Sequence, residues 1–132
     1  MGFWVKKSTF FEFVDGDKKV RRFLKYHNVK IKTPDGQVFD SKREFERYNE
    51  LVMMERRGLI NDLKRQVRFK IVPKVNGVKR ARFYIADFVY TEGGKQIIED
   101  VKSPITAKDS TYTLKRDLVK WQYPDYEFKE FF

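Results

Sequence analysis

Two adjacent glycines, Gly93 and Gly94, lie between two stretches rich in β-branched and aromatic residues and predict a tight β-hairpin. The two stretches cover residues 81–90 and 96–102. If the glycines form a two-residue loop, counting outward along both strands places Asp87 directly opposite Asp100. Directly opposed residues have Cβ atoms about 5 Å apart, and like charges there destabilise a sheet. The hairpin therefore requires something that offsets the repulsion between two carboxylates.

A divalent cation held by both carboxylates would offset this repulsion. Lys102 follows Asp100 by two residues, so it falls on the same face of the strand and adds a positive charge. Two acids and a lysine on one face suit metal-assisted hydrolysis of a phosphodiester, because a metal polarises the phosphate and lowers the pKa of a bound water. The structural alternative for Asp87 is an ion pair with an arginine such as Arg82 or Arg68.

Glu99 competes with Asp100 for the role of the second acid. A three-residue turn would shift the register by one and bring Glu99 into that role. In the two-residue register Glu99 faces the opposite side of the sheet, where a structural hydrogen bond or ion pair is expected. For Asp100 with Lys102 the structural alternative is a surface ion pair on an edge strand, which contributes little stability.

The pattern Asp87 followed by Asp100-Val101-Lys102 resembles the PD-(D/E)XK nuclease superfamily. Within that superfamily, residues 39–128 resemble small phage-encoded Holliday junction resolvases and related recombination endonucleases. The resemblance implies that Asp87 and Asp100 bind Mg²⁺, for which Mn²⁺ would substitute, with the Val101 carbonyl in the same shell. It implies that Lys102 orients the attacking water. No small-molecule cofactor is implied.

The resemblance also implies a third acid, Glu44, on the first helix, as a metal ligand and catalytic residue. The alternative is structural, because Ser41-Lys42-Arg43-Glu44 spells a capping box in which the glutamate satisfies backbone donors at the helix start. Ala86 stands where the name-giving proline of the superfamily would be.

The chain is strongly basic, with 29 Lys and Arg against 19 Asp and Glu, which gives a net charge of +10. Such a charge attracts polyanions and makes nucleic acid the default partner, although a basic composition without a specific partner is the alternative. Gln66 begins a strand and either contacts substrate or is a plain polar start. Lys115 matches a lysine of the phage relatives or else lies on a solvated helix face. The expected DNA contacts are Lys42, Arg43, Gln66, Lys108, Lys115 and Arg116.

The remaining pattern predicts the elements around the hairpin. A helix over 41–57 ends before Gly58, a strand covers 66–73, a second helix covers 110–122 and a last strand covers 126–131. The second helix is expected to align Leu114, Leu118 and Trp121 on one face, and the loop 103–109 is expected to be a flexible substrate clamp. The order α-β-β-β-α-β is the restriction-endonuclease-like core of the superfamily, an α/β (α+β) fold with a mixed central sheet.

The first forty residues read as a β-rich annex. Residues 3–14 and 18–26 alternate in polarity around Asp15-Gly16-Asp17 and predict one hairpin. A second hairpin is expected from 29–32 and 37–39, with its turn at Thr33-Pro34-Asp35-Gly36. We therefore expect a single nuclease domain over 1–132, with an annex at 1–39 and the core at 40–132.

The leading hypothesis is a metal-dependent endodeoxyribonuclease that cuts branched DNA, as a phage Holliday junction resolvase working as a homodimer. The alternatives are a nicking, mismatch or restriction-type endonuclease on the same core, or a non-catalytic basic DNA-binding protein. The sequence has no cysteine and no long apolar run, so a cytoplasmic protein without a membrane segment is expected, in the bacterial host if it is phage-encoded.

Overall fold

The computed structural model describes residues 3–8, 10–14 and 30–132 and divides into two compact units, Met1–Asn49 and Glu50–Phe132. In the first unit, β1 (Phe3–Ser8) pairs antiparallel with β2 (Phe10–Val14). The prediction of a single strand over 3–14 is therefore wrong, because the chain reverses within it and Phe3 pairs with Val14. The expected partner strand at 18–26 lies outside the described residues.

The second predicted hairpin of the annex is confirmed. Strands β3 (Ile31–Lys32) and β4 (Val38–Phe39) pair antiparallel, with Ile31 opposite Phe39. In the turn, the Gly36 amide donates to the Thr33 carbonyl at 2.9 Å, and Gly36 has a φ of +92°. A positive φ is readily available to glycine, which explains the sequence of this turn.

Helix α2 (Lys42–Arg56) also ends where the sequence predicts. Gly58 has a φ of +77° and donates its amide to the Glu55 carbonyl at 3.0 Å. The Leu59 amide donates to the Met54 carbonyl at 2.9 Å. These two bonds form a Schellman motif, in which a glycine in the left-handed conformation satisfies the last helical carbonyls.

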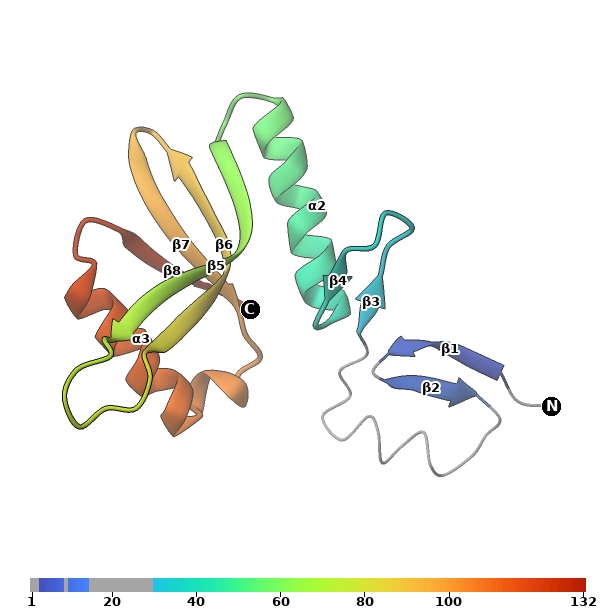
Figure 1. Ribbon diagram of the computed structural model, residues 1–132. Coiled ribbons are helices and arrows are strands. Elements are labelled where there is room, and N and C mark those ends of the chain that lie inside the picture. The colour runs from blue at the N-terminus through green and yellow to red at the C-terminus, as the bar shows by residue number, and fades with distance from the viewer. Residues whose placement is uncertain (1–2, 9, 15–29) are drawn as a thin grey trace. The chain divides into compact units, whose positions relative to one another are not determined.

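The second unit is built on a four-stranded sheet with the order β5-β6-β7-β8 (Figure 1). The strands are β5 (Asn61–Val72), β6 (Arg82–Glu92), β7 (Lys95–Val101) and β8 (Glu127–Phe131). β6 pairs antiparallel with both β5 and β7, whereas β8 pairs parallel with β7. A parallel pair requires a crossover connection, and α3 (Ser110–Gln122) provides it. The predicted α-β-β-β-α-β order and mixed sheet are confirmed.

Strand β5 begins at Asn61, well before the predicted start at residue 66. The added segment has few β-branched residues, and Asp62 adopts a φ of +57° where the register with β6 shifts. This irregularity interrupts the alternation by which a strand is recognised in a sequence. The segment is fixed instead by a non-local contact, because the Leu63 amide donates to the Glu55 carboxylate at 3.0 Å.

Helix α3 packs on the sheet through a different face from the predicted one. Leu114 and Trp121 are 62% and 74% exposed, and only Leu118 of the predicted stripe packs partly against the core. The buried residue is Val119, flanked by Tyr112 and Tyr123. The rotation of the helix is set by polar anchors that periodicity does not reveal. The Gln122 side chain donates a hydrogen bond to the Ile71 carbonyl at 2.8 Å, and the Tyr123 hydroxyl donates one to the Lys70 carbonyl at 2.9 Å.

Among the described residues, no helix is both long enough and apolar enough to cross a membrane.

The Gly93-Gly94 turn provides a direct test of the hairpin geometry. Gly94 has a φ of +78°, and a Cβ added there would meet no atom within 4 Å, so substitution affects only the backbone conformation. We expect Gly94→Ala to lower the free energy of unfolding by about 1 kcal/mol, and Gly94→Asn by less, because asparagine tolerates the left-handed region better. Denaturant unfolding would measure both. An equal loss in the two variants would contradict this explanation.

Candidate functional site

The two-residue turn sets the register of the site as predicted. Glu92 pairs with Lys95, and the recorded pairs continue to Phe88 opposite Glu99. Glu99 is fully buried and accepts a hydrogen bond from the Tyr90 hydroxyl at 2.7 Å. The three-residue turn that would have made Glu99 the second acid is therefore wrong, and Glu99 has the structural contact expected of it.

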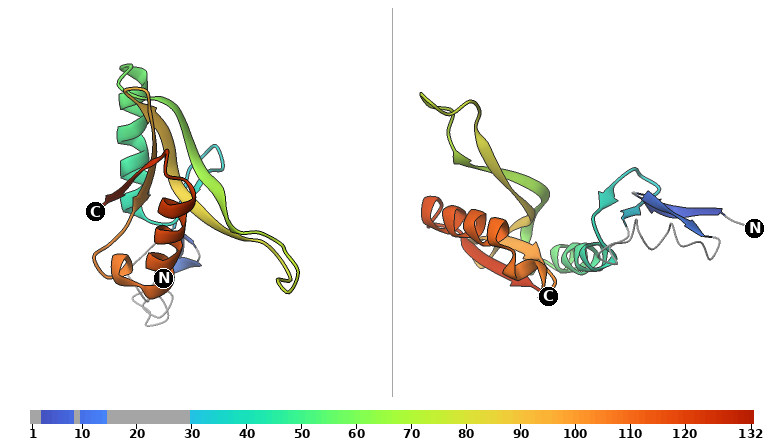
Figure 2. Two further views of the ribbon diagram at one scale, coloured as in Figure 1. Left: turned by 90° about the vertical axis from the view of Figure 1, so that its left-hand side faces the viewer. Right: turned by 90° about the horizontal axis from the view of Figure 1, so that it is seen from below.

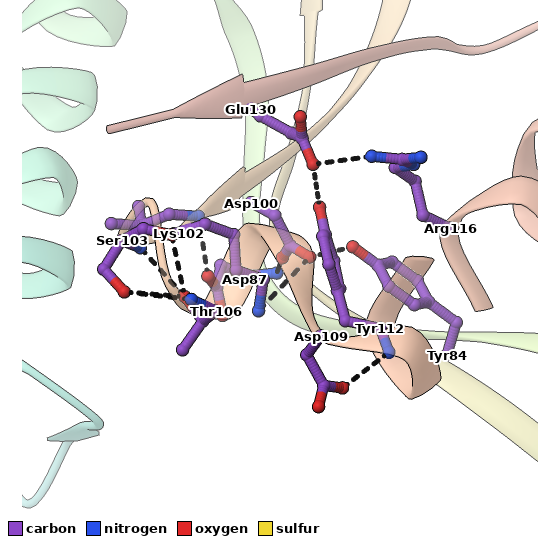
Figure 3. Close-up of polar contacts among 11 residues, drawn as sticks. Tyr84, Asp87, Asp100, Lys102, Ser103, Thr106, Asp109, Tyr112, Arg116 and Glu130 are labelled. Carbon is purple, nitrogen blue, oxygen red and sulfur yellow. Dashed lines mark hydrogen bonds and ion pairs between the residues drawn. The ribbon is translucent and has the colours of Figure 1, made fainter. Parts of the chain in front are cut away.

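Beyond the Phe88–Glu99 pair, β6 and β7 are joined by hydrogen bonds to the side chains of Asp87 and Asp100. The Asp87 amide donates to Asp100 Oδ1 at 3.0 Å, and the Val101 amide donates to Asp87 Oδ2 at 2.9 Å (Figure 3). Each acid is thus held by the backbone of the other strand. The prediction that Asp87 and Asp100 come together is confirmed.

The Asp100 carboxylate lies almost entirely out of contact with water, with an exposed fraction of 1%. Burial raises the pKa of its carboxyl above the ordinary value, opposed by the positive charge of Lys102 and by hydrogen bonds. The Tyr84 hydroxyl donates to Asp100 Oδ2. Burial, followed by the negative charge of Asp100, raises the pKa of Tyr84, so this hydroxyl keeps its proton and remains a donor.

Lys102 lies beside Asp100 and is itself mostly covered. Its Nζ is 3.8 Å from Asp100 Oδ2 and 4.5 Å from the centre of the Tyr112 ring. The ammonium thus lies between a carboxylate and the face of an aromatic ring, and both attract a cation. The alternative of a solvent-exposed ion pair does not describe this contact, because the Asp100 side chain is buried.

A second acid, Glu130, lies next to Asp100 on β8 and completes a row across the sheet. Its Oε2 accepts from the Tyr112 hydroxyl at 2.6 Å and from Arg116 at 3.3 Å (Figure 3). Burial and this hydrogen bond raise the pKa of Tyr112, so it also remains a donor. Arg116, predicted to contact DNA, has internal partners in Glu130 and Asp117.

Sequence reasoning missed Tyr84, Tyr112 and Glu130. Strict alternation puts Tyr84 on the opposite face from Asp87, yet its hydroxyl reaches Asp100. The reason is that the alternation of faces shifts by one residue along β6. Tyr84, Ala86 and Val89 all belong to one buried cluster, so the spacing between its members is first two residues and then three. Asp87 lies at this change of phase.

Gln66 lies opposite Asp87 on β5, between the pairs Arg65–Phe88 and Val67–Ala86. It has a φ of +53° in the middle of a strand, a conformation that costs a non-glycine residue about 1–2 kcal/mol. Strain of this kind is often found beside functional sites. Gln66 lies across the ladder from the first acid, and its contact with substrate stays a prediction.

Glu44 caps the start of α2 nearly as predicted, with its carboxylate on the amide one residue before Ser41. Its amide donates to Ser41 Oγ at 3.1 Å, and its Oε1 accepts from the Asp40 amide at 3.0 Å. The carboxylate is buried and has a structural role at the start of α2, in the Met1–Asn49 unit. Lys42 and Arg43 are exposed in the same turn. Metal binding by Glu44 and DNA contact by Lys42 and Arg43 stay predictions.

The loop after β7 is more ordered than the predicted flexible clamp. It contains a 3-10 turn, η1 (Thr106–Lys108), which two hydrogen bonds fix in place. The Ser103 amide donates to Thr106 Oγ1 at 2.9 Å, and the Thr106 amide donates to Ser103 Oγ at 3.2 Å (Figure 3). Lys108 is exposed at the end of this turn, and Lys115 is half-buried on α3. Their contacts with DNA remain untested.

The carboxylates of Asp87 and Asp100 are oxygen donors, the type that suits a hard cation that takes only a few of its ligands from the protein. Within the described residues, no group of three or more His, Cys, Asp and Glu side chains is placed to hold a metal ion. Mg²⁺ in phosphoryl-transfer sites commonly uses one or two carboxylates, with waters and substrate phosphate as its other ligands. Asp87 and Asp100 supply such a pair of carboxylates. Their carboxylate oxygens are of the donor type that Mg²⁺ binds, and among the described residues they do not form an all-protein cage.

A family model with the description "Protein of unknown function (DUF1064)" matches residues 23–130. The chain belongs to the DUF1064 family. The match covers α2, α3, strands β5 to β7 and most of β8, so the candidate site lies within the residues matched by the family model. No curated protein and no solved structure matched the chain.

The buried Asp100 predicts a specific pH dependence of stability in the metal-free protein. Because its pKa is raised in the folded state, its contribution is fully present below the ordinary carboxyl pKa and is lost as pH rises through the raised value. Asp100→Asn removes this titration. As pH rises over this window, the wild type should lose stability relative to the variant. The difference in unfolding free energy, variant minus wild type, should therefore increase with pH when both proteins are measured in EDTA. A difference that does not change with pH would contradict the assignment.

The backbone of Gln66 predicts an unusual response to substitution. We expect Gln66→Val to lower the unfolding free energy by about 1–2 kcal/mol, because a β-branched residue tolerates positive φ poorly, and Gln66→Gly to change it by less than about 0.5 kcal/mol. Lys64→Val, at an exposed position of the same strand without positive φ, is the matched control and should have little effect. Similar losses at positions 64 and 66 would argue against strain.

Proposed function

We propose that this protein is a Mg²⁺-dependent endonuclease that hydrolyses phosphodiester bonds in DNA. The observation that supports it is the interlocked pair of Asp87 and Asp100, with Lys102 Nζ at 3.8 Å from the buried carboxylate. Burying a carboxylate beside a second one is costly, and such arrangements concentrate at sites where the charge is used.

Each residue of this cluster has a role in the proposal. Asp87 and Asp100 would hold the metal, with the Val101 carbonyl as a further ligand. When bound, Mg²⁺ supplies Lewis-acid polarisation of the phosphate and lowers the pKa of a water in contact with it. Lys102 orients the attacking water and stabilises the negative charge that develops on the phosphate. The water oxygen forms a new bond to phosphorus, one ester bond breaks, and the leaving oxygen takes up a proton.

Tyr84 is a positioning residue in this proposal. Its hydroxyl donates to Asp100 and keeps its proton, because burial raises its pKa. Tyr112 holds Glu130 at 2.6 Å and covers Lys102 with its ring. These two tyrosines fix the orientation of the carboxylate and the ammonium before any substrate binds, which is a general requirement of electrostatic catalysis.

The substrate class follows from the charge and from the resemblance to phage resolvases. A net charge of +10 favours a polyanion, and we propose branched DNA, with four-way junctions as the preferred form. Symmetric cutting of a junction requires two active sites related by a two-fold axis, so the proposal includes a homodimer. The proposed location is the cytoplasm, that of the bacterial host for a phage-encoded chain.

A non-catalytic basic DNA-binding protein is the second candidate. It is favoured by the hydrogen bonds that both carboxylates already accept from the protein and by the absence of a three-ligand group among the described residues. Another endonuclease on the same core differs only in its substrate. A panel of linear duplex, flap, mismatch and four-way junction substrates, with and without Mg²⁺, separates these possibilities.

The acids and the lysine should be needed for cleavage and not for binding. We expect Asp87→Asn and Lys102→Ala each to lower the cleavage rate by at least about 10²-fold, because each removes a charge used in the transition state, while junction affinity in EDTA changes little. Cleavage would be followed on a labelled junction with Mg²⁺.

Asp62→Asn is the matched control for Asp87→Asn. Asp62 is an exposed acid on the neighbouring strand with a φ of +57°, which asparagine tolerates. The Asp62→Asn variant should cut the labelled junction at the wild-type rate. Cleavage that persists in both Asp87→Asn and Lys102→Ala would refute the assignment, and absence of cleavage in the wild type on every substrate would favour the non-catalytic candidate.

A further inference from the structure

Within the four-stranded sheet, positive charge is concentrated on the hairpin of β5 and β6. Residues 67–86, which we call the basic arm, comprise the part of β5 after Gln66, the connecting turn and the part of β6 before Asp87. The arm contains six of the 29 cationic residues and none of the 19 acids, so its own charge is +6. The six are Arg68, Lys70, Lys74, Lys79, Arg80 and Arg82.

All six cationic side chains of the arm are exposed. Within the part of the chain that the structure describes, none of them forms an ion pair. Arg68 packs its guanidinium over the Phe83 ring at 4.1 Å. A set of cations with no acid among them repels itself, and such a set is stabilised by an anionic partner.

One face of the arm is fixed to the body of the unit. Phe69 and Ile71 are buried in the core. The Ile71 carbonyl accepts from Gln122 at the end of α3 at 2.8 Å, and the Lys70 carbonyl accepts from Tyr123, which follows the helix, at 2.9 Å. The opposite face carries Arg68 and Lys70 on β5. The arm is therefore a two-stranded ribbon that is packed on one side and presents cations on the other.

The end of the arm is a tight turn that stands away from the sheet and α3 (Figure 2). The Val78 amide donates to the Val75 carbonyl at 2.8 Å, and Gly77 has a φ of +87°. Lys79 and Arg80 follow the turn directly, at the part of the arm farthest along the strands from the carboxylates.

We propose that the basic arm binds the phosphate backbone of duplex DNA. A two-stranded β-ribbon has a width that the major groove admits, and Lys and Arg contacts to phosphates give affinity without sequence preference. A duplex is favoured over a single strand because the aromatic residues of the arm are not free to stack on bases. Tyr84 is buried, and Phe83 is covered by Arg68.

The arm leads directly into the candidate site. Arg82 precedes Asp87 on the same strand by five residues, which at about 3.4 Å each is roughly 17 Å. A duplex held along the arm is thus led toward the two carboxylates. This inference depends on the proposed function only in taking nucleic acid as the partner.

The test is equilibrium binding of a labelled linear duplex in EDTA, where cleavage does not occur. We expect Lys79→Gln with Arg80→Gln to weaken duplex affinity by about tenfold at low salt, and to reduce the slope of log affinity against log salt by about two, since each lost phosphate contact contributes about 0.9. Both positions are exposed, and a thermal melt of the variant would verify that it is folded.

Arg56→Gln with Arg57→Gln is the matched control. These two arginines are exposed, lie at the end of α2 outside the arm, and give the same change in charge. An unchanged salt slope in the arm variant, an equal loss in both variants, or tighter binding to duplex RNA or phosphatidylserine vesicles than to duplex DNA would overturn the proposal. A wild-type protein that binds duplex through the arm but cuts no DNA would refute the proposed nuclease and leave the arm's role supported.

Discussion

The burial of the Asp100 carboxylate is the constraint on which the other features of the site depend. A carboxylate removed from water loses several kcal/mol of solvation unless donors and positive charge replace it. The protein supplies the Asp87 amide, the Tyr84 hydroxyl and the Lys102 ammonium, each from a different position along the sheet. This compensation is partial, because the pKa of Asp100 stays raised. A cation bound at both carboxylates, as proposed for this site, would offset part of the remaining cost.

Local signals in the sequence were sufficient for the end of α2 and for the meeting of the acids. Gly58 ended α2, and the Gly93-Gly94 turn fixed the strand register. Each of these is a short-range backbone requirement that a single residue type satisfies. The features that escaped prediction were set by contacts between distant segments. Tyr84 reached Asp100 only because β6 changes phase, which a regular period of two does not anticipate.

The same distinction explains the errors on α3 and at the start of β5. Apolar residue types on α3 occupy two adjacent faces, and the polar anchors Gln122 and Tyr123 decide which one packs. The start of β5 depends on Glu55, eight residues away, and has a backbone irregularity at Asp62. In both cases the periodicity of the sequence was compatible with the observed structure and did not determine it.

The two-glycine turn also restricts how this hairpin can vary among related chains. A single inserted residue would exchange the two faces of β7, so that Glu99 and Asp100 would trade surroundings and the tyrosine partner of each would be lost. Two inserted residues would preserve the alternation and only lengthen the ribbon. Length variation at this position should therefore occur in steps of two.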